Sequence, residues 1–334
     1  MSFENSSDND GESFSFPEVS VPRPVRFWLM LLCDIPSIVC SFCLIIHIIM
    51  NRTQRHALHN HTILLLLIFY LPIQLIDITF YLIFFSYDSI QPSQPLVCLL
   101  WWFVDYCFYV GGIVLMAWLA IERHILIFYD RLLLNRRGRF LFHYLPLIII
   151  VTYILLFYLI VIFLLPCENN YLYTVLVCGS SPCYESYGIL GMWEFILHAA
   201  TPVLLEGIAS IALLLRVQIQ RRRLRQSNQW RKQRRMIIQL LLVTTLNIGI
   251  NFSNCALFCA QFFGLSLEYG VEAQLYFSFL DYFVIFLFPF ISLSQFPDLR
   301  KTIKKKLLGV VRRQPHHTAT VTHTRRDIPM NRMA

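Results

Sequence analysis

Charged residues are scarce in this chain, and lysine is almost confined to its last third. Only 14% of the 334 residues are Asp, Glu, Lys or Arg, whereas 57% are hydrophobic. The first lysine is Lys232 and the next is Lys301. In an average soluble domain about a quarter of the residues are charged. The composition therefore excludes a soluble globule and indicates a protein embedded in a membrane.

Several chemical signatures are also missing. We find no internal or inverted repeat, no nucleophile–base pairing and no glycine-rich phosphate loop. His56, His59 and His61 stand close together, but no second histidine cluster on the same side completes a metal site. We therefore expect no enzyme activity, no cofactor and no resident metal ion.

What the chain does contain is seven long apolar stretches. Each is long enough to cross a hydrocarbon core of roughly 30 Å as a helix. The stretches cover residues 25–50, 62–86, 97–123, 141–165, 189–215, 236–263 and 270–294. The predicted fold is an all-α membrane protein, a bundle of seven transmembrane helices.

The basic residues fix the orientation of this bundle. Of the 28 Lys and Arg residues, 26 fall into alternate gaps, with two in 51–61, five in 123–140, nine in 216–235 and ten in 300–334. The positive-inside rule then places the N-terminus outside and the C-terminus in the cytoplasm. The net charge of +8 is explained by anionic lipid and a cytoplasmic partner, so we expect no nucleic acid.

Four regions follow from these patterns. Residues 1–24 form an extracellular tail, 25–295 the seven-helix domain, 296–312 an amphipathic helix on the inner membrane interface, and 313–334 a disordered cytoplasmic tail. A merely solvated basic tail is the alternative for 296–312. The acidic start lacks the features of a cleavable signal peptide, so the first stretch should act as a signal anchor. Asn5 begins the glycosylation sequon expected to face outward.

The ten cysteines divide by location. Six lie within helices, where small apolar packing residues are the simplest interpretation. Cys98, Cys167, Cys178 and Cys183 lie at the outer boundary, where disulfides persist. Four cysteines allow three pairings, which their positions alone leave open.

The ends of the third stretch carry a family resemblance. Glu122-Arg123-His124 stands at its cytoplasmic end, and Cys98 precedes Arg123 by 25 residues. Pro202 lies in the fifth stretch and Phe288-Pro289 in the seventh. This pattern resembles the rhodopsin-like (class A) G-protein-coupled receptors, whose third helix begins with a disulfide cysteine and ends in Asp-Arg-Tyr.

The departures from that family are numerous. Phe288 and Ser292 replace the Asn and Tyr of its seventh-helix motif, and Tyr70 stands where the family has its sodium-binding Asp. The usual tryptophans of the fourth and sixth helices are missing. No span carries a lysine for a retinal Schiff base, which excludes a light-sensing opsin. The resemblance is to a divergent receptor of no well-known subfamily.

The resemblance implies a disulfide between Cys98 and Cys178, leaving Cys167 and Cys183 as a candidate second pair. It also implies an extracellular ligand and a heterotrimeric G protein, engaged through Glu122, Arg123, His124 and the basic segment 221–235, with Pro289 in the activation motif. The Thr-rich tail is a candidate arrestin site.

Arg123 has a physical interpretation of its own. A charged group at this depth should face the bundle or the inner vestibule. Glu122 beside it is expected to hold it in a resting ion pair. In the alternative, Arg123 extends to the inner head groups.

Three carboxyl groups, Asp105, Glu194 and Asp281, lie in the outer halves of the third, fifth and seventh stretches. Intramembrane carboxylates are usually functional, although some only pair with Tyr, His or Asn. Asp105 and Tyr282 match the positions of the ligand-binding Asp and Tyr of amine receptors. The outer face carries ten acids against two bases, so we expect a cationic amine or peptide ligand.

Other polar and aromatic residues have two interpretations. Trp101 and Trp102 are expected to be interfacial tryptophans rather than cation–π partners of the ligand. Asn247, Asn251 and Asn254 share one helix face and form either a structural hydrogen-bond stripe or a conformational element.

Two rival functions use the same residues. A transporter or channel would take the intramembrane acids as an ion path, and a membrane-embedded enzyme would pair them at one depth. Both are less well supported than a receptor, because repeats and catalytic pairs are missing from the sequence.

Overall fold

The computed structural model describes residues 19–179, 182–223, 229–264, 266, 270–297, 299–303 and 305. Seven helical spans among these residues are long and apolar enough to cross a membrane. They are Arg23–Met50, Leu58–Tyr87, Pro95–Phe128, Arg136–Leu164, Gly188–Ile219, Leu241–Gln261 and Glu272–Leu293, called the first to seventh spans below. The predicted all-α fold with seven spans is confirmed for this part of the chain. Asn5 and the Thr-rich tail lie outside it.

Several spans are built from more than one helical element. The α-helices are α1 (Arg23–Met50), α2 (Arg52–Arg55), α3 (His61–Pro72), α4 (Ile78–Tyr87), α5 (Pro95–Trp102), α6 (Tyr109–Phe128), α7 (Arg136–Arg139), α8 (Leu145–Leu159), α9 (Gly188–Glu194), α10 (Thr201–Arg223), α11 (Gln229–Phe262) and α12 (Val271–Leu293). Short π-helical segments join them at η2 (Ile73–Asp77), η3 (Phe103–Phe108), η5 (Phe140–Tyr144), η6 (Ile160–Leu164) and η9 (Phe195–Ala200). Single 3-10 turns occur at η1 (Leu58–Asn60), η4 (Asp130–Leu133) and η8 (Cys183–Ser186). In η7 (Leu176–Gly179), Val177 and Cys178 have left-handed backbone conformations.

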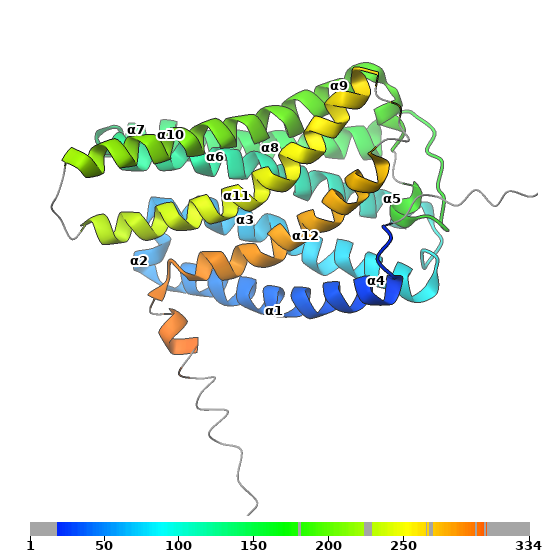
Figure 1. Cartoon of the computed structure of the whole chain (residues 1–334), viewed down its shortest axis with the longest axis horizontal. Coiled ribbons are helices and arrows are strands. Elements are labelled where there is room, and N and C mark those ends of the chain that lie inside the picture. The colour runs from blue at the N-terminus through cyan, green and yellow to red at the C-terminus, as the bar shows by residue number, and fades with distance from the viewer. Residues whose placement is uncertain are drawn as a thin grey trace, which may run out of the picture. The chain divides into compact units, whose positions relative to one another are not determined.

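The described residues from 19 to 295 belong to one compact unit, in which the long helices lie side by side as a bundle (Figure 1). The short connecting helices α2 and α7 lie at one end, and α5 and α9 begin at the other (Figure 1). We call these the inner and the outer end, following the charge pattern. The third span is the core of the bundle. In its 18-residue apolar window 61% is buried, against 22–50% in the corresponding windows of the other spans, and α6 packs on α3, α8, α10 and α11.

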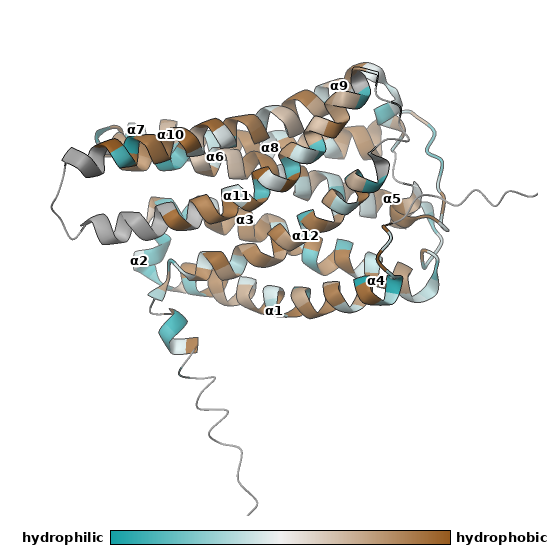
Figure 2. Ribbon diagram, in the orientation of Figure 1, coloured by the Kyte–Doolittle hydropathy of each residue, from teal (hydrophilic) through white to brown (hydrophobic). Residues whose placement is uncertain are grey.

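Apolar side chains cover the outward faces of the helices. Figure 2 shows hydrophobic residues along the middle of the helices and hydrophilic ones at places such as α2. Leu32, Ile208 and Ile148 are each more than half exposed. A lipid-facing surface requires this arrangement, because backbone polar groups are satisfied inside each helix and the side chains meet hydrocarbon.

Proline lies at or beside several of the helix irregularities. Pro36 and Pro289 lie inside α1 and α12, and Pro146 lies in the first turn of α8. Pro72 is followed directly by the π segment η2, and Pro202 is the second residue of α10, which begins where the π segment η9 ends. Such segments absorb the backbone hydrogen bond that proline removes.

The second unit begins at Phe296. Pro297, residues 299–303 and Lys305 are helical, and the Arg300 amide donates to the Phe296 carbonyl at 3.0 Å. This is the start of the helix expected over 296–312, and the remainder of that range lies outside the described residues.

Candidate functional site

Two disulfides hold the loop at the outer end. Cys98 in α5 is bonded to Cys178, 80 residues later, with the Cα atoms 5.8 Å apart. Cys167 is bonded to Cys183. These are the two pairings that the family resemblance implies. The loop between the fourth and fifth spans is therefore tied to the start of the third span and closed on itself.

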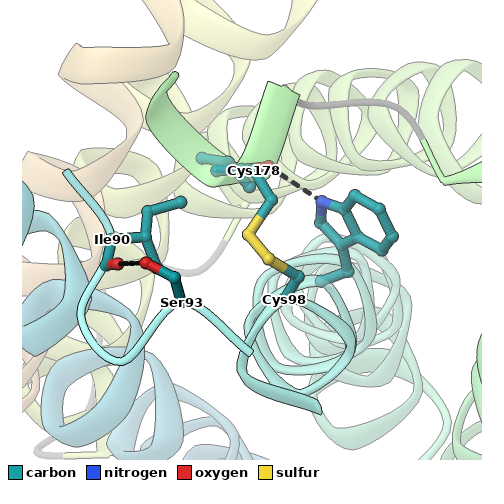
Figure 3. Close-up of a disulfide and its surroundings, with 6 residues drawn as sticks. Ile90, Ser93, Cys98 and Cys178 are labelled. Atoms are coloured by element: carbon teal, nitrogen blue, oxygen red, sulfur yellow. Dashed lines mark hydrogen bonds between the residues drawn. A yellow bond between two sulfur atoms is a disulfide. The ribbon is translucent and has the colours of Figure 1, made fainter. Parts of the chain in front are cut away.

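Two hydrogen bonds lie beside the first disulfide. Figure 3 shows Cys178 above Cys98, beside the turn in which the Ser93 hydroxyl donates to the Ile90 carbonyl at 2.9 Å. The Trp102 indole N–H donates to the carbonyl of Val177 at 2.9 Å. A covalent bond and a hydrogen bond thus fix the same loop segment.

The two tryptophans of the third span do not face the membrane interface. Trp101 and Trp102 are fully buried. The Trp101 indole N–H donates to the Asp77 carboxylate at 2.6 Å. The expectation of interfacial tryptophans was wrong, because each indole N–H has a protein acceptor, Asp77 for Trp101 and the loop carbonyl of Val177 for Trp102, and the ring can therefore be buried.

Two acids and a tyrosine meet between the second, third and seventh spans. Tyr282 lies within electrostatic reach of the carboxyl groups of Asp77 and Asp105. The Tyr282 ring packs edge-on against Tyr81, with centroids 5.2 Å apart. Asp77 is fully buried, whereas Asp105 is partly exposed. The arrangement leaves Asp105 as the accessible carboxylate of this group.

A second polar cluster joins the third, sixth and seventh spans. The Tyr109 hydroxyl contacts both Asp281 Oδ2, at 2.6 Å, and Asn251 Oδ1, at 2.8 Å. Asn251 donates to Asp281 Oδ1 at 3.1 Å and to Asn247 Oδ1 at 3.0 Å. Asn247 in turn donates to Glu206 Oε2 of the fifth span at 2.6 Å. Two buried acids are therefore linked through two asparagines, as a hydrogen-bond stripe.

Glu194 belongs to a different cluster, between the fourth and fifth spans. Its Oε1 accepts hydrogen bonds from the hydroxyls of Tyr158, at 2.6 Å, and Tyr184, at 3.0 Å. Tyr158 and Tyr184 are fully buried. Glu194 thereby attaches the outer loop, through Tyr184, to the helices below it. The structure does not bring it together with Asp105 and Tyr282.

At the inner end, Glu122 and Arg123 point to different neighbours. Glu122 accepts a 2.5 Å hydrogen bond from the Thr62 hydroxyl, and its other oxygen lies 2.5 Å from His143 Nδ1. Arg123 is buried and donates to the His59 carbonyl at 3.0 Å. The expected pair between Glu122 and Arg123 is replaced by one between Glu122 and His143. Successive residues of a helix point about 100° apart, so both cannot face the same groove.

The remaining motif residues are placed as follows. His124 Nε2 lies 2.6 Å from the Ala209 carbonyl of α10. Pro289 lies inside α12, and its neighbour Phe288 packs edge-on against Tyr70, with ring centroids 5.3 Å apart. Tyr70 is thus buried against the seventh span. Among the described residues, no group of three His, Cys, Asp or Glu side chains is placed to hold a metal ion.

The sequence did not point to His143 or His61. His143 is buried, and its Nε2 lies 2.9 Å from His61 Nδ1. An imidazole inside an otherwise apolar span was the available signal, but its partners lie 82 and 21 residues away and only the fold brings them together.

Comparisons with known proteins agree with this geometry at the level of the fold. No protein-family model and no curated protein sequence matches the chain. Among solved structures, the crystal structure of squid rhodopsin aligns with a TM-score of 0.64 at 16% identity, covering 89% of this chain and 88% of that one. The chain therefore has the seven-helix fold of rhodopsin.

Proposed function

We propose that this chain is a plasma-membrane receptor that binds an extracellular cationic ligand and activates a heterotrimeric G protein. The observation that carries the proposal is the third span. One of its ends is tied by Cys98 to the outer loop, and the other ends in Glu122-Arg123-His124, within a rhodopsin fold. The most buried span thus links the outer surface to the inner one.

For the ligand we propose Asp105 as the carboxylate that contacts a cationic amine or the basic group of a peptide, with Tyr282 beside it. Three acids were candidates from the sequence. Asp281 is buried and bonded to Tyr109 and Asn251, and Glu194 is bonded to two tyrosines. Asp105 remains partly exposed, so a ligand can reach it with less rearrangement. Glu194 and Asp281 then support the walls of the site.

On the cytoplasmic side we propose that the G protein engages Arg123, His124 and the basic segment 221–235. A ligand that binds one conformation better shifts the population toward it, and this couples the two faces. Arrestin is a proposed second partner through the Thr-rich tail.

The test is a screen of amines and of basic or amidated peptides on cells that express the chain, with nucleotide exchange on purified G proteins as readout. For an agonist so found, Asp105→Asn should lower the potency about 10- to 150-fold, the range expected for a lost hydrogen bond to a charged group. Glu168→Gln removes an equal charge from the exposed part of the outer loop and should have little effect. Comparing the two variants therefore separates a direct contact between Asp105 and the ligand from long-range attraction of a cation to the acidic outer face.

Two outcomes would contradict the proposal. If no G protein exchanges nucleotide with any ligand, the receptor function is wrong. If Asp105→Asn leaves the agonist response unchanged, Asp105 is not in the ligand site.

A further inference from the structure

Asp281 of the seventh span lies in a buried hydrogen-bond network that has more close contacts than its amide and hydroxyl groups have hydrogens to fill. The Tyr109 hydroxyl oxygen of the third span lies 2.6 Å from Asp281 Oδ2 and 2.8 Å from Asn251 Oδ1. Asn251 Nδ2 of the sixth span lies 3.1 Å from Asp281 Oδ1. Asp281 and Asn251 are 4% and 5% exposed, so the contacts are shielded from bulk water.

The hydrogens in this network can be counted, because each contact needs one hydrogen between its two heavy atoms. The Asn251 amide has two, which reach Asp281 Oδ1 and the oxygens of Asn247. Tyr109 has a single hydroxyl hydrogen for two contacts. A hydrogen bond prefers an angle above about 150°, so one hydrogen cannot fill both contacts at these distances. One further hydrogen is needed, and Asp281 is the group that can carry it.

The count gives the same answer for either orientation of the Asn251 amide, whose oxygen and nitrogen positions are assigned from their partners. With the two exchanged, the nitrogen donates to Tyr109, and the Tyr109 hydroxyl is free to donate to Asp281 Oδ2. The amide oxygen then faces Asp281 Oδ1 at 3.1 Å, and two oxygens at that distance again need a hydrogen between them. In both orientations the missing hydrogen comes from Asp281.

The titratable groups that face Asp281 come from three other spans. Tyr70 of the second span, Tyr109 of the third and Cys255 of the sixth lie within electrostatic reach of it. Each of these side chains is neutral when protonated, so none of the three supplies a positive charge. A buried carboxylate without a positive partner is strongly unfavourable, whereas the neutral acid carries no charge and fills every contact. Electrostatics and the hydrogen count therefore agree.

Glu206 of the fifth span shows the opposite case in the same network. Its Oε2 accepts a hydrogen bond from Asn247 Nδ2 at 2.6 Å, and this contact is filled without a proton on the acid. Asp281 differs because its Oδ2 faces a hydroxyl whose single hydrogen is used by the contact with Asn251. Glu206 is thus a matched buried acid for which the count requires no proton.

We propose that Asp281 binds one proton and donates it to the Tyr109 oxygen, while the Tyr109 hydroxyl donates to Asn251 Oδ1. The third, sixth and seventh spans are then joined by a neutral acid in which every contact has its hydrogen. A neutral acid does not attract a cation, which is a second reason, beside burial, to place the ligand contact at Asp105 rather than at Asp281. The proton site needs neither the ligand nor the G protein, so it stands or fails separately from the proposed receptor function.

The experiment is infrared spectroscopy of the full-length protein in lipid nanodiscs at pH 7, where an Asp side chain in water is ionised. The C=O stretch of a protonated carboxyl group lies at higher frequency than the bands of a carboxylate. The spectrum of the wild type minus that of Asp281→Asn should contain one such band, and it should shift when the aspartate is labelled with ¹³C. The Asn side chain can donate to Tyr109 and accept from Asn251, so this variant should keep the fold.

Two more variants complete the test. Glu206→Gln removes the matched acid, and the Asp281 band should persist. Tyr109→Phe removes the acceptor of the proton, so the band should move to higher frequency, a shift that is read by comparison with the wild type alone. A difference spectrum that contains only carboxylate bands, or a band that is lost in Glu206→Gln, would overturn the proton site. A band that keeps its frequency in Tyr109→Phe would overturn the donation to Tyr109.

Discussion

At the scale of single residues, Gly112 of α6 shows how closely the second and third spans approach. A Cβ atom at Gly112 would lie 2.6 Å from the Tyr70 ring, and one at Gly111 would lie 2.4 Å from the Phe69 ring. Both rings are at most 4% exposed, so they have little room to move. Small residues let membrane helices pack closely because side-chain packing, not the hydrophobic effect, holds helices together in lipid.

We predict that Gly112→Ala destabilises the protein by about 1–3 kcal/mol, the usual cost of overpacking a well-packed core. Gly249→Ala is the matched control, since a Cβ there would meet no atom within 4 Å. That substitution should be neutral or stabilise the helix by up to about 1 kcal/mol. Thermal unfolding of purified protein in one detergent measures both. Equal unfolding temperatures for the two variants would contradict the packing described here.

The Tyr109 hydroxyl is a second position where one atom carries a contact between spans. It is the group of the third span that reaches both Asp281 and Asn251. Tyr109→Phe keeps the ring but leaves one buried acceptor without its donor, so we expect a loss of about 1–3 kcal/mol in unfolding free energy. Tyr87→Phe removes the same hydroxyl from a side chain that is 69% exposed and should change stability by less than about 0.5 kcal/mol. Chemical unfolding of the two variants side by side tests the difference.

At the scale of elements, the spans themselves could be predicted from the sequence, because length and hydropathy decide whether a helix crosses a bilayer. The predicted ranges and the observed helices differ mainly at their ends. For example, α6 continues to Phe128, five residues beyond the predicted end of the third stretch at residue 123. Hydropathy predicts only the part of a helix that lies in the hydrocarbon. The helix itself continues into water as long as its backbone hydrogen bonds continue.

What could not be predicted is which polar groups share a partner. Asp105 and Tyr282 were expected together, and Tyr282 lies within electrostatic reach of Asp105, but their role as a ligand site stays a prediction. Glu194 has the same depth and chemistry, but it faces Tyr158 and Tyr184 because the rotation of each helix about its axis is set by packing across the whole bundle. The close approach of Glu122 and His143 could not be predicted from the sequence for the same reason. Periodicity identifies a shared face on one helix, not the residue opposite it.

The outer loop is the element most dependent on covalent bonds. In the chain-entropy description, a disulfide that closes a loop of 80 residues raises the free energy of unfolding by about 4.5 kcal/mol, and one that closes a loop of 16 residues raises it by about 3 kcal/mol. Both values are upper limits here, because the membrane already restricts the unfolded chain. We therefore predict that the double variant Cys98→Ser/Cys178→Ser loses more thermal stability than Cys167→Ser/Cys183→Ser. Replacing cysteines in pairs avoids a free thiol that could pair wrongly. The opposite order in a thermal-unfolding comparison would contradict the prediction.

At the scale of the whole molecule, 26 of the 28 basic residues lie in alternate connections, and the fold places the connections α2 and α7 at the same end of the bundle (Figure 1). The Cys98–Cys178 disulfide lies at the opposite end, with α5, and a disulfide belongs in the oxidising compartment. Two independent properties, charge and redox chemistry, thus assign the same end to the cytosol.

This assignment predicts the accessibility of the two termini in intact cells. An epitope fused to residue 1 should be stained by antibody without permeabilisation, whereas one fused to residue 334 should be stained only after the membrane is opened. The Asn5 sequon should then carry a glycan that Asn5→Gln removes, seen as a loss of apparent mass on a gel. The sequons at Asn51 and Asn60 stay unmodified because they face the cytosol, so Asn60→Gln is the matched control and should leave the mass unchanged. Staining of the C-terminal epitope on unopened cells would reverse the orientation and with it the placement of Asp105 and Arg123 relative to ligand and G protein.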